Sequence, residues 1–310
     1  VVEMMEAGPL SAKGVLGVLP PLNGTVTVEK AAINAVMAGC IPDYFPVVLA
    51  AIKAILQPQF NAGSITTTTG GAAPVVIVSG SIATTLRIHG GTAVFGSGHR
   101  ANATIGRALR LTMRNLGGAT SEAMEKSTQA WPGKYTMCFA ENAEANPWEP
   151  LHVDLGFPEN VSTVTVAACR WVHTFVEATQ ETGQGVLETM GSSMTAGGVS
   201  GYVFQATGAS PVVVLGPEHA QEIAAAGYSR RDVKEYIYQN VRQPMGEVKD
   251  RGHYGSRSWP AEFDGQDDDF MVPLVTDPDR IILVVAGGDG RHSSWFPAWS
   301  AAQRATEIIG

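Results

Sequence analysis

Apolar positions in the segment 27–39 recur three or four residues apart, which is the spacing of one face of an α-helix. They are Val28, Ala31, Ala32, Ala35 and Val36. Gly39 follows them and suits the end of a helix. A second helix is predicted up to about Leu56, and Asp43 is placed to cap its first turn. The pattern therefore predicts two helices that are joined at Cys40.

Short, continuous apolar runs further along the chain predict strands that are buried on both faces. The octapeptides GAAPVVIV, from Gly71, and GASPVVVL, from Gly208, contain two such runs and align without a gap. After each run the sequence predicts a helix, a further strand and a Trp-x-Pro sequence. The helices begin near Arg100 and Ser229, and the Trp-x-Pro sequences begin at Trp148 and Trp295. We interpret this shared order as an ancient internal duplication.

The alternation of buried strands with helices predicts an α/β fold. We expect two pseudo-symmetric lobes, each a largely parallel sheet flanked by helices. The expected boundaries are 1–24 for an N-terminal extension, 25–157 for the first lobe and 160–310 for the second lobe. The segment 161–191 is consistent either with a strand followed by a helix or with one long helix.

Composition narrows the class of function. The 310 residues are 45% hydrophobic and 16% charged, which is enough for one large core or two smaller cores. The net charge of −8 argues against a nucleic-acid or anionic-membrane surface, which would need a basic patch. No apolar run approaches the roughly 18–20 residues of a membrane span. The three cysteines are widely spaced and suggest neither a disulfide framework nor a zinc site, so we expect a cytoplasmic protein.

The expected place for a ligand is the edge of the sheets where parallel strands end, in the cleft between the lobes. Four loops should meet there. They are Ser79-Gly80, Glu141-Asn142, residues 216–219 and residues 287–292. We expect Glu141 and Asn142 to contact a small-molecule substrate.

The loop GGDGRHSSW has the strongest functional pattern. Gly287 and Gly288 let the backbone approach a ligand or form an anion-binding nest. Among the polar residues that follow, Asp289 is the candidate acid, Arg291 would bind an anion and His292 is the candidate base. Ser293 adds a hydroxyl as a further substrate contact. The alternative is a polar turn that caps a helix beginning near Ser293.

Gly288-Asp289 followed by Ser294-Trp295 resembles the signature of the UGSC-type (seleno)protein family. That signature has a Gly-Asp, a Cys/Sec-Gly-Ser-Cys element and then Thr/Ser-Trp, all after a strand. Gly290 and Ser293 stand where the family has its redox residues. The resemblance implies a loop that keeps its position and its capacity for binding but has lost its thiols. Cys40 would then be a candidate thiol located elsewhere.

The segment RIHGGTAVFGSGHRANATIGRALR, which contains His89 and the pair Gly90-Gly91, is the second candidate. It leads into a predicted helix whose first amides favour an anion. His99 is a candidate for proton transfer, and Arg100, Asn102 and Arg107 are candidates for substrate binding. Arg107, Arg110 and Arg114 share one helix face, which is more typical of a solvated or acid-paired surface. In SITTTTGG, Thr69 and Gly70 offer a hydroxyl and an amide to a ligand, or else form an ordinary connector.

Three further histidines are weaker candidates. His219 follows a strand end and is either a base or a helix residue at an interface. His152 lies near Glu149 and Asp154, which is the basis of a metal-site hypothesis, although no HExxH spacing supports it. His173 has apolar neighbours and is expected to be structural.

Cys40 lies just before a predicted helix start, where the dipole and free amides lower the pKa of a thiol. Against this, cysteine is among the residues most often buried. Cys138 and Cys169 lie within predicted strands and are expected to be inert.

The sequence thus predicts an enzyme that acts on a small polar or anionic molecule between two lobes. Cys40 would be the nucleophile, His292 or His99 would transfer protons, and hydrolase or lyase chemistry fits this set. No cofactor fingerprint is evident. The main alternative is a metal-dependent lyase or hydratase that uses Glu141, Glu149 or Asp154, and a third is a non-catalytic ligand-binding subunit. Apolar helices make a homo-oligomer plausible.

Overall fold

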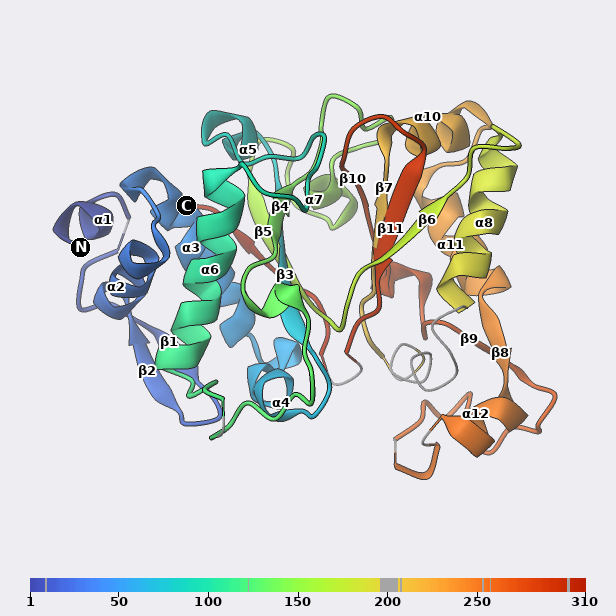
Figure 1. Cartoon of the computed structure of the whole chain (residues 1–310), viewed down its shortest axis with the longest axis horizontal. Helices are drawn as coiled ribbons and strands as arrows, with labels where there is room; N and C mark the ends of the chain where they lie inside the picture. Colours follow the sequence, from blue (N-terminus) through green and yellow to red (C-terminus); the bar gives the residue numbers. More distant parts are fainter. Residues whose placement is uncertain are drawn as a thin grey trace.

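Two four-stranded sheets pack face to face, and helices cover the outer face of each sheet (Figure 1). The structure is a computed structural model. It describes residues 1–8, 10–121, 123–195, 206, 208–252, 254–256, 258–299 and 302–310. The α/β class predicted from the sequence is confirmed.

The first sheet has the order β12-β5-β3-β4. Its strands are β12 (Ala305–Ile308), β5 (Thr163–Cys169), β3 (Ala73–Ser79) and β4 (Cys138–Ala140). β3 and β4 are parallel, whereas β5 is antiparallel to both β3 and β12.

The second sheet has the order β10-β7-β11-β6. Its strands are β10 (Ile282–Val285), β7 (Val212–Leu215), β11 (His292–Phe296) and β6 (His173–Val176). β10 and β7 are parallel, and β11 is antiparallel to both β7 and β6. Both sheets are therefore mixed, with one parallel and two antiparallel pairs, and the expectation of largely parallel sheets is wrong.

The two-residue period of a strand explains how an almost wholly apolar run serves two layers. In β3, Val75 and Ile77 pack in the cluster between the two sheets, whereas Val76 and Val78 pack against the helices. Strand β7 alternates in the same way, with Val214 facing inward. Continuous burial of these strands follows from their position between two layers.

The longer helices among the described residues form two sets, one over each sheet. The first set is α2 (Val28–Ala38), α3 (Phe45–Leu56) and α6 (Arg100–Asn115), and the second is α8 (Gly183–Thr195), α10 (Pro217–Ala225) and α11 (Arg230–Asn240). The Thr27 side chain accepts a hydrogen bond from the Lys30 amide at the start of α2, and Gly39 ends that helix with φ of 91°. The two helices predicted on either side of Cys40 are therefore present.

Shorter elements complete the chain. Before β5 they are α1 (Val2–Glu6), β1 (Val15–Leu19), β2 (Gly24–Thr27), η1 (Pro42–Tyr44), η2 (Pro58–Phe60), α4 (Ala62–Thr67), α5 (Ile82–Thr85), η3 (Pro132–Lys134) and α7 (Leu151–Asp154). After α11 they are β8 (Arg242–Pro244), α12 (Met245–Arg251), η4 (Tyr254–Ser256), β9 (Met271–Pro273) and η5 (Pro278–Arg280). Within the described ranges, no helix is both long and apolar enough to cross a membrane.

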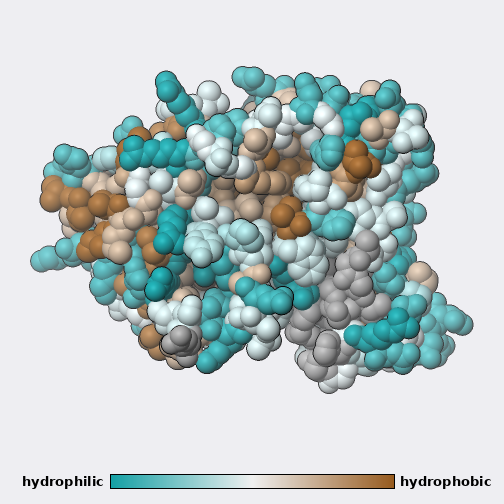
Figure 2. Space-filling model, in the orientation of Figure 1, coloured by the Kyte–Doolittle hydropathy of each residue, from teal (hydrophilic) through white to brown (hydrophobic). Residues whose placement is uncertain are grey.

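Exposed apolar side chains gather at the end of the molecule formed by α1, the β1–β2 hairpin and α2 (Figure 2). On α2, Ile33, Val36 and Met37 are 40%, 42% and 63% exposed. The self-association suggested by the apolar helices stays a prediction.

The chain crosses between the sheets twice. β5 belongs to the first sheet, and the next strand, β6, belongs to the second. In return, β11 lies in the second sheet and the chain then runs back to β12 at the edge of the first, beside α3 (Figure 1). The two crossings pass each other at a bridge between Cys169 and Ala298. The structure thus divides the chain differently from the predicted boundaries at 157 and 160.

The aligned octapeptides occupy matching places, since β3 and β7 are each the strand that pairs in parallel with an edge strand. The Trp-x-Pro sequences do not match. Trp148 lies in the loop before α7, whereas Trp295 lies within β11. The segment 161–191 contains the strands β5 and β6 and then the start of α8, so the alternative of a strand followed by a helix is correct except for the additional strand β6. The shared ancestry of the halves stays a prediction.

Candidate functional site

The carboxyl ends of the parallel strand pairs of both sheets meet at one edge of the molecule. The Asn142 amide, just after β4, donates to the carbonyl of Val285 at 2.8 Å, and its side-chain nitrogen lies 3.2 Å from the carbonyl of Gly287. The amide of Gly287 in turn donates to Gly90 at 2.8 Å. Loops from both halves are therefore joined where the sequence placed the candidate site.

Gly288 shows how closely these loops approach. A Cβ at this position would collide with the side chain of Thr92 and lie 3.0 Å from its Cα. Only glycine allows this contact without moving one of the loops. Two pockets lie at this edge, and we call them the first-sheet pocket and the second-sheet pocket; Thr92 and Gly288 both line the second.

The first-sheet pocket has a volume of about 270 Å³ and lies beyond the ends of β3 and β4. Its polar lining includes Arg87, His89, His99, Asn142 and Glu144. The rings of His89 and His99 are stacked with centroids 3.5 Å apart. His89 Nε2 lies 2.7 Å from the carbonyl oxygen of Thr92, which can only accept, so Nε2 carries a hydrogen.

Asn102 positions His89 and does not face a substrate. Its Oδ1 accepts from the His89 amide at 2.8 Å, and its Nδ2 donates to the His89 carbonyl at 2.9 Å. Asn102 is also buried. The expected substrate contact is therefore replaced by a supporting role, since both polar atoms of the side chain are used.

The second-sheet pocket has a volume of about 350 Å³ and is more apolar, with Val94, Phe95 and Val214 in its wall. Asp289 and His292 line its rim and are exposed. His292 Nδ1 lies 2.6 Å from the carbonyl of Gly290, so Nδ1 carries a hydrogen and Nε2 is the basic nitrogen of the neutral ring.

The glycine loop already holds an anion from within the chain. Glu218 accepts hydrogen bonds from the amides of Gly290, at 2.5 Å, and Arg291, at 2.8 Å. These two backbone bonds hold the pKa of Glu218 below its usual range. The guanidinium of Arg291 forms ion pairs with Glu222 at 2.5 Å and Glu177 at 3.4 Å. The expected anion site at Arg291 is therefore occupied by the protein's own carboxylates.

Ser293 is also internal. Its Oγ accepts from the Gly216 amide at 2.9 Å and lies 2.8 Å from His219 Nδ1. His219 is fully buried, and burial lowers its pKa. Ser293 begins no helix, because it lies in β11. These contacts tie the start of β11 to α10 and engage both side chains within the protein, although Ser293 also lines the second-sheet pocket.

Glu141 forms the centre of a buried polar cluster. Its Oε2 accepts from Ser79 Oγ at 2.6 Å, and both its oxygens lie 3.0 Å from the Leu151 amide. Arg230, on α11, approaches it to 3.6 Å. Ser79 Oγ also lies 2.8 Å from His152 Nδ1. Because the hydroxyl proton goes to the carboxylate, the imidazole must be the donor to Ser79, which is the reverse of what a serine nucleophile needs.

Cys40 lies in the hydrophobic cluster between the first sheet and its helices. Burial raises the pKa of its thiol and outweighs the hydrogen bond from Thr104 and the nearby charge of Arg100. The expected lowering of this pKa is therefore wrong, because the thiol points into packed side chains. Burial also raises the pKa of Cys138 and Cys169, as expected of inert residues.

The remaining candidates lie away from the first-sheet and second-sheet pockets. Arg100 donates twice to the carbonyl of Gly39, at 3.1 and 2.9 Å, and so caps α2. Thr69 and Gly70 precede β3, at the end of the sheet opposite the cleft, where Gly70 packs against Trp299. Arg107 lines a third pocket further along α6.

No group of three or more metal-ligating side chains is found within the described part of the chain. Asp154, one of the residues suggested as a ligand, is ion-paired with Lys234 at 2.5 Å. His152 and Glu149 are likewise engaged, His152 with Ser79 and Glu149 with Arg230 at 3.6 Å.

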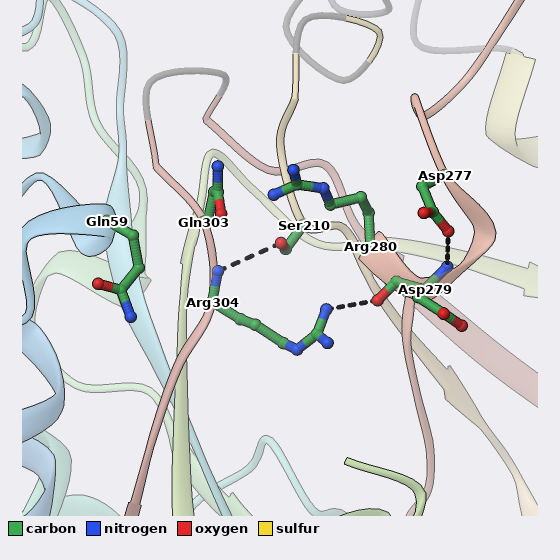
Figure 3. Close-up of a pocket in the computed structure, with 7 residues that line it drawn as sticks. All are labelled: Gln59, Ser210, Asp277, Asp279, Arg280, Gln303 and Arg304. Carbon is green, nitrogen blue, oxygen red and sulfur yellow. Dashed lines mark hydrogen bonds between the residues drawn. The ribbon is translucent and has the colours of Figure 1, made fainter. Parts of the chain in front are cut away.

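A further cavity, of about 400 Å³, lies at the opposite end of the strands (Figure 3). Arg304 extends from the segment before β12 and donates to the carbonyl of Asp279, while Gln59 faces the cavity from the other half. Asp277 accepts from the Asp279 amide at 2.8 Å, and Arg280 completes the charged lining. Two arginines balance two aspartates here, so the cavity has no clear charge preference.

No protein-family model matches the chain, and no curated protein matches it. The resemblance to the UGSC-type family therefore stays a prediction. Arg87 and His89 line the pocket and both stand within the candidate segment that begins at Arg87, although the sequence assigned neither of them a specific role.

Proposed function

We propose that the protein is an enzyme that binds a small anionic molecule in the first-sheet pocket and transfers a proton through His99. The stacked pair of His89 and His99 is the observation that carries this proposal. A ring held flat against a second ring, which is itself fixed by Asn102 and Thr92, has a defined orientation. Such fixed geometry is what acid–base catalysis requires.

His99 is the ring that is available to a ligand. His89 uses Nε2 to bind Thr92, whereas the His99 ring has no hydrogen-bond partner among the described residues. His99 also stands directly before α6, where the first amides of the helix favour a negative charge. A bound carboxylate or phosphate would accept from an imidazolium at this place.

Charge around the pocket supports an anionic ligand. Arg87 lines it and is exposed, and no carboxylate within 4.0 Å pairs with it in the described structure. Glu144 is the opposing charge, while the Glu141 carboxylate is neutralised by Arg230. A cation and two imidazoles therefore face one free carboxylate.

The proposed chemistry is of the hydrolase or lyase type. Both need a group that donates or accepts a proton beside a bound polar substrate. Cys40 is not part of this proposal, because its thiol lies in the helix layer. The departing or attacking group would meet His99, with Arg87 holding the negative charge of the substrate.

The test is ligand-induced thermal stabilisation with a panel of small anions, namely acetate, oxalate, malate and inorganic phosphate. A ligand at 100 times its Kd stabilises the folded state by about 2.7 kcal/mol, which is measurable. We expect at least one of these anions to stabilise the wild-type protein and to lose its effect in His99→Ala. His292→Ala is the matched control, because it removes an exposed histidine from the other pocket.

Equal stabilisation of the wild type and His99→Ala by the same anion would overturn the assignment of the site. An anion effect lost in His292→Ala and kept in His99→Ala would move the site to the second-sheet pocket.

A further inference from the structure

A third pocket, of about 310 Å³, lies along the last two turns of α6, away from the first-sheet and second-sheet pockets. Four cations line it, and they are Arg107, Arg110, Arg114 and Lys134. The carboxylate in its lining is Glu125. We propose that this pocket binds the phosphate group of a small phosphorylated molecule.

The helix places its arginines on one face. Arg107, Arg110 and Arg114 are three and seven residues apart, so their side chains project from neighbouring positions of successive turns. The sequence favoured a solvated or acid-paired face. In the structure all three line one pocket. Lys134, in η3, and Tyr135 also line it.

The carboxylate of Glu125 is already paired within the pocket. Both oxygens of Glu125 lie 2.6 Å from Lys134 Nζ, and Oε1 also accepts from the Ser127 hydroxyl at 2.6 Å. Its nearest approach to Arg110 is 3.8 Å, which is beyond hydrogen-bond distance. Glu125 thus pairs closely with Lys134 and more distantly with Arg110, so four cations face one carboxylate among the described residues that line the pocket.

Arg110 is the buried donor of the site. Its side chain is 8% exposed, and Nε donates to the carbonyl of Lys134 at 3.0 Å. NH1 has only the weak acceptor sulfur of Met113, at 3.5 Å, and NH2 has only the distant contact with Glu125. A guanidinium that is buried with donors so poorly satisfied favours an oxyanion beside it.

Arg107 and Arg114 add charge at the mouth of the pocket. Neither has an ion-pair partner in the described part of the chain. Arg107 lies 6.0 Å from the centre of the Tyr135 ring, which is 70% exposed. Arg107 and Arg114, which have no ion-pair partner among the described residues, stand beside Arg110 in a chain whose net charge is −8, so this cluster is not a general property of the surface.

A phosphate group fits these donors better than a single carboxylate. Arginine presents its donors as a planar fork that matches two oxygens of a phosphate, and a dianion offsets more than one guanidinium. The exposed ring of Tyr135 beside Arg107 provides an apolar surface for the organic part of a phosphate ester. The two pockets are distinct, because the eight residues from His99 to Arg107 rise by about 12 Å along a helix.

The test is isothermal titration of the full chain with inorganic phosphate and with phenyl phosphate at low salt. The key variant is Arg107→Met with Arg114→Met, since these side chains make no ion pair whose loss would unfold the protein. We expect its affinity for both probes to fall by about tenfold or more. Arg231→Met with Arg251→Met is the charge-matched control, because both of its sites are more than half exposed on other helices. That control should bind as the wild type does.

The variant His99→Ala distinguishes the third pocket from the first-sheet pocket. It should keep the affinity of the third pocket for phosphate. No measurable binding of either probe by the wild type would overturn the proposal. So would an equal loss in the key variant and in its charge-matched control, which would show attraction by net charge alone. Phosphate binding that is lost in His99→Ala and kept in the key variant would assign the phosphate to the first-sheet pocket. It would refute phosphate binding in the third pocket. Tighter binding of phenyl phosphate than of inorganic phosphate supports an organic ester as the ligand, and equal binding supports free phosphate.

Discussion

Replacing Arg230 with methionine should destabilise the protein more than any surface change of the same kind. The side chain is 1% exposed and reaches from α11 to Glu141 and Glu149 in the other half, 3.6 Å from each. It also donates to the main-chain carbonyls of Leu283 and Glu149. Arg230→Met leaves Glu141, whose side chain is 2% exposed, as a buried carboxylate without its cation.

Breaking a buried ion pair by removing one partner costs about 3–5 kcal/mol. The methionine still fills apolar space, so we expect the lower part of this range, about 3 kcal/mol. With a urea m-value of about 3 kcal/mol/M, the unfolding midpoint should fall by about 1 M. The measurement is urea unfolding followed by circular dichroism, with all variants in the same denaturant series.

Arg231→Met is the matched control, because the neighbouring residue is of the same type but is 57% exposed. Its ion pairs with Glu235, at 2.7 Å, and Asp279, at 2.8 Å, lie at the surface and are worth about 0–1 kcal/mol. Adding Glu141→Gln to Arg230→Met removes the unpaired charge and should recover part of the loss. Equal, small losses in Arg230→Met and Arg231→Met would refute the view that a buried ion pair ties the halves together.

Two further outcomes follow from the site. Cys40→Ala should cost only about 1 kcal/mol for one buried atom and leave anion binding in the first-sheet pocket unchanged; loss of that binding would return the thiol to the site. The amides of Gly290 and Arg291 lower the pKa of Glu218 in the folded protein. The resulting stabilisation of the folded state is fully present above the unfolded pKa of about 4.3. It is lost as the pH falls through the lower pKa of the folded state. Glu218→Gln should therefore lower the melting temperature at pH 6 and converge with the wild type in acid, as a series of melting curves from pH 6 to pH 2.5 would show; a constant difference across that series would contradict the assigned bonds.

The sequence predicted the elements whose signal is local. The helix over α2 follows from apolar spacing with Gly39 at its end, and β3 and β7 follow from continuous apolar runs. The meeting of the loops after β4 and β10 was also predicted, because loops after parallel strands lie at one edge of a sheet. The antiparallel neighbours could not be predicted in this way, since the pairing of β5 with β12 joins residues that are far apart in the sequence.

The roles of polar side chains were harder to predict for the same reason. The glycine loop has the pattern of an anion nest, and the structure does place a carboxylate on it. That carboxylate is Glu218, which lies 72 residues before Gly290. Asn102 likewise has the chemistry of a ligand contact, but both its polar atoms hold the backbone of His89. Residue type and local pattern show what a group is able to bind, whereas only the fold shows whether the chain has already supplied the partner.

The two crossings between the sheets also bear on how the chain is made and how it can be divided. When the first half leaves the ribosome, the outer edge of β5 has no partner until residues 305–308 have been made. An unpaired edge readily accepts a strand from another chain, so the first sheet is exposed to mispairing throughout synthesis of the second half. A fragment cut near residue 160 would lack both β5 and β12 from its sheet, and a fragment starting there would carry both strands without the sheet to which they belong. Each half has a core between its sheet and its helices, but a third cluster between the sheets is shared, so neither half is expected to fold independently.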